Sequence, residues 1–206
     1  MIAVVDYGAS NVKSVLRAFA AVGADAALTA DPAAVRAADR IVVPGVGNFA
    51  PAMRALTESG LGDAVRETAR TGRPTLGICL GVQLFLESSE EAPGTAGLGL
   101  LRGNVVRFRT SLVVPHVGWA RVRVTDAGAR HPVVAAAFHG TEAYFYHVHS
   151  YHPDGVPPDV ALAVADYGEA FPTMLGCDSV LGVQFHPEKS QEAGLALLRA
   201  FARWTP

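Results

Sequence analysis

The chain has 206 residues, of which 50% are hydrophobic and 17% are charged, and its formal net charge at pH 7 is -2. This length can supply a sizeable core without cross-links, and we expect one domain over residues 1–206. The charge balance argues against nucleic acid as a main partner, because there is no basic excess to neutralise phosphates.

Signals for cellular location are few. Two cysteines, Cys79 and Cys177, do not form a disulfide framework, which favours a reducing compartment. The first apolar run is interrupted at Asp6, too early for a signal peptide, and no apolar run approaches the ~20 residues that span a bilayer. We therefore expect a cytoplasmic protein with no membrane partner.

The first half of the chain alternates short apolar strands with amphipathic helices. The apolar run 2–5 is continuous, as in a strand buried on both faces. Apolar residues then recur at helical spacing over 12–22, with Ser10 able to cap this helix and Gly23 able to end it. The same patterns predict strands over 26–29, 41–43 and 74–79, and helices over 32–38, 53–56, 61–69 and 80–85.

Strands joined by helices of this length indicate an α/β fold with a parallel sheet and helices on both faces. Functional groups in such sheets gather at the carboxyl ends of the strands. This rule points to the loops 6–11 and 44–48 and to the segment around Cys79.

The pattern changes after residue 94. Short or alternating apolar runs separated by turns indicate antiparallel hairpins added to the sheet in the C-terminal half, and Asp178-Ser179 is a plausible two-residue turn. An amphipathic helix over 192–201 should direct Leu195, Leu198 and Phe201 inward. The strands are predicted over 105–108, 113–114, 121–124, 144–151, 160–165, 173–177 and 180–185.

The strongest functional signal is Gly77-Ile-Cys-Leu-Gly81, between a predicted strand and a predicted helix. A nucleophile with glycine two residues away on either side is typical of the nucleophile elbow, where glycine lets the backbone turn sharply. The dipole at the start of a helix also favours a thiolate. We therefore interpret Cys79 as a reactive nucleophile.

A second signal is His186-Pro-Glu188. In an extended chain His186 and Glu188 project to the same side, and Pro187 should keep His186 extended and resist a helical turn. A thiol nucleophile needs an imidazole base, and that imidazole needs an orienting partner. The alternative is a buried cysteine with an unrelated surface loop.

Other motifs allow competing interpretations. Gly45-Val-Gly47 begins a G-x-G-x-x-A dinucleotide pattern, although it does not follow the first strand. His147, His149 and His152 could indicate a metal site, but no clustered carboxylate or cysteine accompanies them. Cys177 is expected to be inert core. Arginines at 107, 109, 121 and 123 form a stripe that is either a solvated face or a docking surface.

Taken together, Gly77 to Gln83 and Gln184 to Glu188 resemble the signatures of class I, triad-type glutamine amidotransferases. The resemblance is closer to the glutaminase subunits of imidazole glycerol phosphate synthase within that family. It rests also on Asp6-Tyr-Gly8 with Asn11, Pro44 to Gly47, Gly97 to Gly103 and Pro115-His-Val-Gly-Trp119, and so spans nearly the whole chain. It implies a doubly wound, flavodoxin-like sheet.

The resemblance also implies a glutaminase with no cofactor and no metal. Cys79 would attack the side-chain amide of glutamine, His186 would transfer protons, and Glu188 would orient His186. The backbone N–H of Leu80 and the strand carrying Val46 and Gly47 would form the oxyanion hole. The residues implied for substrate binding are Gly47, Gln83, Glu91, His149 and Ser150.

The implied partner is a (β/α)₈ cyclase, which would form a heterodimer with this chain and use its ammonia. The products would be imidazole glycerol phosphate and an aminoimidazole carboxamide ribotide, in histidine biosynthesis. The residues implied at the interface are Tyr7, Asn11, His116, Trp119 and Lys189. The chain departs from the family pattern at Ser10, Ala120 and His147, and Ala120 puts one interfacial hydrogen bond in doubt.

Two other functions fit parts of the pattern. A glutaminase could serve a different synthase, although Asp6-Tyr-Gly8 and Pro115 to Trp119 argue against this. A non-catalytic α/β module that binds a partner is the other alternative. The combination of Cys79, His186 and Glu188 argues against it.

Overall fold

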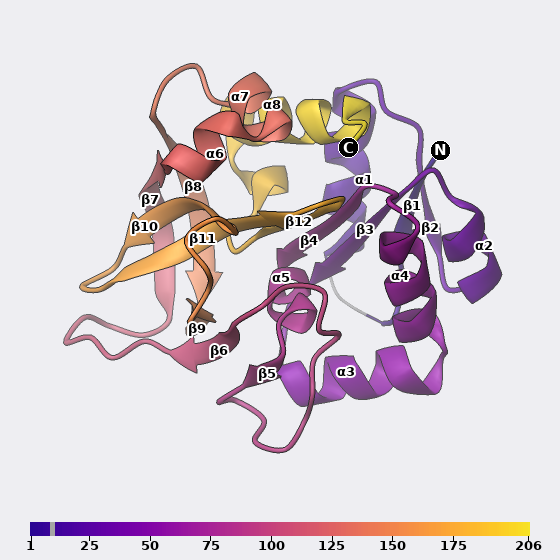
Figure 1. The fold of residues 1–206 in the computed structure, drawn as a ribbon, viewed down its shortest axis with the longest axis horizontal. Helices are drawn as coiled ribbons and strands as arrows, with labels where there is room; N and C mark the ends of the chain where they lie inside the picture. Colours follow the sequence, from indigo (N-terminus) through magenta and orange to yellow (C-terminus); the bar gives the residue numbers. More distant parts are fainter. Residues whose placement is uncertain (9–10) are drawn as a thin grey trace.

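A nine-stranded sheet forms the centre of the computed structural model, which describes residues 1–8 and 11–206. The strand order is β2-β1-β3-β4-β12-β11-β10-β7-β8 (Figure 1). The first five strands in this order are parallel. The sequence predicts this for β1 to β4, whereas β12 comes from the half predicted to form antiparallel hairpins. They are β1 (Ile2–Val5), β2 (Ala26–Thr29), β3 (Arg40–Gly45), β4 (Thr75–Cys79) and β12 (Val180–Val183).

The rest of this sheet is antiparallel, which confirms the change of pattern in the C-terminal half. Asp178 and Ser179 form the turn between β11 and β12, where Cys177 pairs with Val180. The predicted strand over 113–114 is wrong: this segment is a loop without strand pairing, and Val113 is 80% exposed. The antiparallel strands are β7 (His116–Val124), β8 (Glu142–His149), β10 (Ala161–Asp166) and β11 (Ala170–Cys177).

A second, three-stranded sheet has the order β5-β6-β9. The predicted strand over 144–151 divides at Ser150, because β8 stays in the large sheet whereas β9 pairs with β6. Ser150 therefore lies at the junction of the two sheets. The three strands are β5 (Ser88–Ser89), β6 (Asn104–Arg107) and β9 (Tyr151–Asp154).

Helices cover both faces of the large sheet and create two cores. One core contains buried side chains of α1, α7 and α8, and the other contains those of α2, α3, α4 and α5 (Figure 1). The predicted inward positions of α8 are confirmed at Leu198 and Phe201, whereas Leu195 is only half-buried and Leu197 is fully buried. The helices are α1 (Val12–Ala21), α2 (Pro32–Ala37), α3 (Phe49–Glu58), α4 (Leu61–Arg70), α5 (Leu80–Phe85), α6 (Asp126–Arg130), α7 (Pro132–Ala137) and α8 (Gln191–Arg203).

The sequence patterns did not predict α6 and α7. Thr125 caps α6 by accepting a hydrogen bond from Gly128 N at 3.0 Å, and Pro132 occupies the first turn of α7. Both helices are short and lie in the half of the chain that the patterns assigned to hairpins. The predicted role of Ser10 as the cap of α1 lies outside the described residues.

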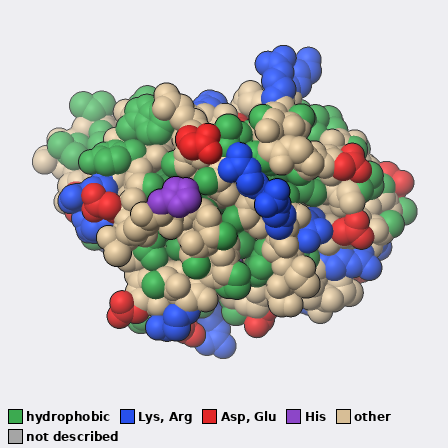
Figure 2. All heavy atoms as spheres, turned by 90° about the horizontal axis from the view of Figure 1, so that it is seen from above, with side chains coloured by type: hydrophobic (Ala, Val, Ile, Leu, Met, Phe, Trp, Pro, Cys, Tyr) green, Lys and Arg blue, Asp and Glu red, His purple; other side chains and the backbone are tan. Residues whose placement is uncertain are grey.

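Charged side chains of both signs are interspersed on the face seen in Figure 2. Within residues 1–8 and 11–206, no helix combines the length and apolarity needed to cross a membrane.

Candidate active site

The carboxyl ends of three neighbouring strands meet at one cleft. β3, β4 and β12 are adjacent in the sheet, and the segments at their ends carry Gly47, Cys79 and His186. A cavity of about 300 Å³ opens there, and its lining includes Cys79 and every residue predicted for the oxyanion hole or substrate binding. A larger cavity of about 490 Å³ lies between α7 and α8 and contains none of the predicted site residues.

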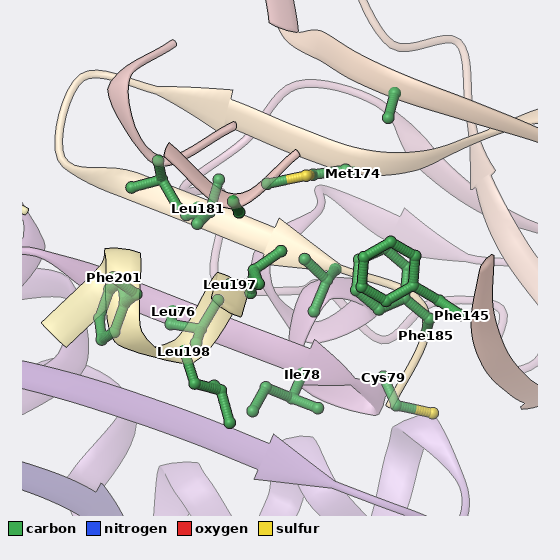
Figure 3. Close-up of a cluster of buried hydrophobic side chains, with 14 of the residues drawn as sticks. Leu76, Ile78, Cys79, Phe145, Met174, Leu181, Phe185, Leu197, Leu198 and Phe201 are labelled. Atoms are coloured by element: carbon green, nitrogen blue, oxygen red, sulfur yellow. The ribbon is translucent and has the colours of Figure 1, made fainter. Parts of the chain in front are cut away.

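Cys79 lies at the end of β4 and immediately precedes α5. In Figure 3 its sulfur points away from Leu76 and Ile78, so the thiol leaves the core at the margin of the cleft. Its backbone has φ 54° and ψ -109°, an unusual conformation for a residue with a side chain. Such backbone strain is often found at functional residues.

The two elbow glycines have a different role from the predicted one. Gly77 and Gly81 are not among the residues with positive φ, so the sharp turn is made by Cys79 itself. A Cβ on Gly81 would lie 1.9 Å from the carbonyl oxygen of Val43, and one on Gly77 would lie 2.8 Å from the backbone of Gly81. Glycine is needed because the start of α5 packs directly on neighbouring backbone.

His186 and Glu188 form a buried pair beside Cys79. The distance from His186 Nδ1 to Glu188 Oε1 is 2.7 Å, and both side chains are about 1% exposed. The predicted extended geometry is wrong beyond His186, because Pro187–Lys189 forms a 3₁₀ turn. Proline favours rather than resists the first position of such a turn, since its missing N–H would be unpaired there anyway.

The electrostatics of this pair favour a protonated imidazole. Burial alone lowers the pKa of His186, but the negative charge of a Cys79 thiolate and the hydrogen-bonded Glu188 carboxylate outweigh it and raise that pKa to about 10. Glu188 fixes Nδ1 as a donor, so Nε2 is the nitrogen left for proton exchange. Among the described residues, His186 Nε2 has no hydrogen-bond partner.

Backbone groups for an oxyanion hole lie on both sides of Cys79. Leu80 is the first residue of α5, and the first N–H groups of a helix have no acceptor within it. Val46 and Gly47 lie opposite in the β3–α3 loop and line the cavity. Gly47 has φ 107°, which residues with a side chain rarely adopt.

The predicted substrate-binding residues also have partners within the chain. Gln83 donates to Tyr151 O, and His149 Nδ1 lies 2.8 Å from the same carbonyl oxygen. Glu91 accepts hydrogen bonds from Asn48 Nδ2 and from the backbone N of Phe49. Glu91 therefore stabilises the start of α3 and with it the loop that carries Gly47.

This position of Glu91 also bears on the dinucleotide interpretation of Gly45-Val-Gly47. A dinucleotide pyrophosphate would bind at the start of the helix after the glycine loop. In this chain the carboxylate of Glu91 occupies the first N–H group of α3. A negative charge there repels phosphate.

Two of the predicted interface residues, Trp119 and Lys189, lie on one exposed surface. Trp119 on β7 is 46% exposed, and its ring lies 6.3 Å from that of Tyr146 on β8. Lys189 Nζ lies 5.7 Å from the centre of the Tyr146 ring. His186 N donates to Tyr146 O at 2.9 Å, so this surface is joined directly to the backbone of the candidate base.

Two other interface predictions point inward. Asn11 Nδ2 donates to Glu188 Oε1 at 2.8 Å, the same oxygen that contacts His186. Tyr7 donates from its hydroxyl to Pro44 O at 2.7 Å, and burial raises its pKa, as does the charge of Cys79. Both side chains connect the loop after β1 to the site.

His116 differs from the interface prediction because its side chain is only 3% exposed. It stacks on His147 and Tyr167, with ring centres 5.1 Å and 4.0 Å apart. Burial also lowers the pKa of His147, to about 3, and that of His149. In the part of the chain that the structure describes, no group of three or more His, Cys, Asp or Glu side chains could hold a metal ion.

Gln184 is a site residue to which the sequence patterns assigned no role. Its side chain is fully buried, and Nε2 lies 3.8 Å from Cys79 Sγ. A signal was present, because Gln184 precedes His186 by two residues in an extended segment and so projects to the same side.

A protein family and several solved structures match this chain. Residues 3–203 match the family described as glutamine amidotransferase class-I. A glutamine amidotransferase structure shares the fold with a TM-score of 0.73 at 18% identity, covering 95% of this chain and 94% of that one. The glutaminase domain of Trypanosoma brucei CTPS with bound acivicin has a TM-score of 0.70 at 18% identity, covering 100% and 96%.

Sequence relatives are more similar. The imidazole glycerol phosphate synthase subunit HisH of Symbiobacterium thermophilum is 46% identical over 98% of this chain and 93% of its own length. The subunit of the same name from Methanothermobacter thermautotrophicus is 43% identical over 98% and 97%. The chain therefore belongs to the class-I glutamine amidotransferase family and, within it, to the HisH subunits of imidazole glycerol phosphate synthase.

Proposed function

We propose that this chain hydrolyses glutamine with Cys79, His186 and Glu188, and that it passes the ammonia to a (β/α)₈ cyclase. The observation that carries the proposal is the cysteine at a strained elbow beside a buried histidine–carboxylate pair. We treat residues 1–206 as one glutamine amidotransferase domain, since the family match spans nearly all of them. Free Cys79 and Cys177 are consistent with a cytoplasmic location.

The reaction follows from the charge state of the pair. The Cys79 thiolate attacks the side-chain amide carbon of glutamine, and the carbonyl oxygen becomes an oxyanion. His186 then gives its proton to the amide nitrogen, the carbon–nitrogen bond of the tetrahedral intermediate breaks, and ammonia departs, leaving a thioester on Cys79. Water, deprotonated by His186, attacks the thioester and releases glutamate while Cys79 regains its thiolate.

The oxyanion requires donors that are fixed before the reaction starts. Leu80 N–H and an N–H of the Val46-Gly47 segment would supply them, and the loss of one such donor typically costs ~10²–10³ in rate. Gln83, Glu91, His149 and Ser150 would recognise the amine and carboxylate of the substrate. All four line the cavity beside Cys79.

The partner proposal rests on the names of the relatives and on the surface around Trp119. That surface offers an aromatic pair and the cation of Lys189, which would pair with a carboxylate of the cyclase. It also adjoins the backbone of His186, and Asn11 adjoins Glu188. A cyclase bound there would act on the orientation of the base, so we expect glutaminase turnover to rise when the cyclase and its nucleotide ligand bind.

The test is Cys79→Ala in the complex with the cyclase. We expect glutamate release to fall to background, while synthesis of imidazole glycerol phosphate continues when ammonium is added. Cys177→Ala is the matched control and should keep both activities, because Cys177 does not line the cleft. The prediction that Cys177 belongs to the core is wrong, since it is exposed at the end of β11. Loss of the ammonium-dependent reaction in folded Cys79→Ala would refute the division of labour between the two subunits.

A further inference from the structure

Gln184 lies between two groups of the site and belongs to neither the triad nor the substrate set. Its Nε2 lies 3.8 Å from Cys79 Sγ, and its Oε1 accepts a hydrogen bond from Gln83 Nε2 at 3.0 Å. Gln83 Nε2 also donates to Tyr151 O at 3.0 Å. A chain of hydrogen bonds therefore runs from the wall of the cleft to the nucleophile.

The direction of this chain is fixed by one backbone carbonyl. Tyr151 O can only accept, so the atom of Gln83 that faces it must be the amide nitrogen. The same nitrogen faces Gln184, so Gln184 must present its oxygen to Gln83. Its NH₂ group is then turned toward Cys79 Sγ. The assignment of both amides thus follows from the network.

Two polar groups within hydrogen-bonding range of Cys79 Sγ favour opposite charge states of the sulfur. Val148 O lies 4.0 Å from Sγ and can accept a hydrogen bond from the neutral thiol. The NH₂ group of Gln184 is a donor only, and a donor stabilises the thiolate. Gln184 is fully buried, so water does not compete for this contact.

We propose that Gln184 is a positioning residue that holds Cys79 Sγ as a thiolate at the edge of the cleft. Gln83 and Tyr151 keep the amide of Gln184 in the donating orientation. The inference rests on the proposed function of Cys79 as the nucleophile. It adds a neutral donor that acts on the sulfur alongside the protonated His186 before substrate arrives.

The test measures the alkylation of Cys79 by iodoacetamide between pH 5 and 10, using the full chain in a Cys177→Ala background. Gln184→Met keeps the length of the side chain but removes the donor. We expect the pH of half-maximal alkylation to rise by about one unit, because a hydrogen bond to the charged form is lost. In the complex with the cyclase, kcat for glutamate release at pH 7 should fall about 10-fold or more with little change in KM.

Two further variants keep the test decisive. Gln184→Glu preserves the size of the side chain and should raise the pH of half-maximal alkylation more than Gln184→Met does, because its carboxylate repels the thiolate. Gln184→Glu also serves as the test variant if Gln184→Met does not fold. Thr173→Val is the control, since Thr173 is a fully buried neighbour that contacts His147 rather than the sulfur, and its profile should match the parent chain.

An unchanged alkylation profile in a folded Gln184 variant would overturn the inference. The readout needs no glutamine, so it is separate from the test of function. A parent chain that alkylates normally but releases no glutamate would refute the proposed function and leave the role of Gln184 intact.

Discussion

Substitution of Gly81 by alanine should damage both stability and catalysis. The added Cβ would lie 1.9 Å from the carbonyl oxygen of Val43 and 3.0 Å from its carbon. Both atoms are backbone of β3, so no side chain can move aside, and α5 must separate from β3 by about 1.5 Å to restore ordinary contact at 3.4 Å. Such overpacking costs ~1–3 kcal/mol, and we expect the upper end because backbone is involved.

The catalytic effect follows from what lies at each side of this contact. Leu80 and Cys79 precede Gly81, whereas Val43 leads to the Gly45–Gly47 segment, so the separation would move the two sides of the proposed oxyanion hole apart. A displacement of about 1 Å at a reacting centre can cost ~10²-fold in rate. We therefore expect kcat to fall at least ~10²-fold and Tm to fall by about 6–12 °C.

The assays are thermal unfolding of the chain and glutamate release in the complex with the cyclase. Gly140→Ala is the matched control, because a Cβ there would have no atom within 4 Å and the backbone is not in the left-handed region. It should leave both quantities nearly unchanged. A Gly81→Ala protein with the Tm and kcat of the parent chain would refute the close-packing explanation of the elbow glycine.

Two further predictions concern pH and the partner. His147 has a pKa of about 3 in the folded chain and about 6.5 in the unfolded chain. Between these values the unfolded chain binds more protons, so the free energy of unfolding falls as pH falls. From pH 7 to 5 the contribution of His147 to this decrease is about 2 kcal/mol. The raised pKa of His186 acts with the opposite sign, so the prediction compares two proteins. Measured by denaturant unfolding, the free energy of unfolding of His147→Phe should fall by about 2 kcal/mol less from pH 7 to 5 than that of the parent chain, and the control His139→Gln should behave like the parent. Equal pH slopes in His147→Phe and the parent would contradict the buried neutral state of His147. Lys189→Ala should weaken binding to the cyclase, measured by calorimetry, or release ammonia to solvent, measured as a higher ratio of glutamate to imidazole glycerol phosphate. The control Arg70→Ala removes an exposed cation on α4 and should do neither. Unchanged affinity and an unchanged ratio in Lys189→Ala would remove Lys189 from the interface.

The sequence predicted the elements of the parallel half well. Continuous apolar runs and helical periods are local signals, so β1 to β4 and their helices required only neighbouring residues. The same signals failed for residues 113–114, because a short apolar run becomes a strand only where another strand is available to pair with it. They also missed α6 and α7, which lie in the half of the chain that the patterns assigned to hairpins.

The sequence by itself determined the chemistry of the elbow and of His186-Pro-Glu188, because motif spacing within a few residues fixes which groups follow which strand. Only the tertiary structure decided what those groups contact. Gln184 faces Cys79, and Asn11 donates to Glu188, across separations of 105 and 177 residues. The order β1-β3-β4-β12 creates these contacts by aligning the carboxyl ends of strands that are distant in sequence. The close packing of Gly81 on Val43 has the same origin, since it depends on how near one strand's backbone comes to the next element.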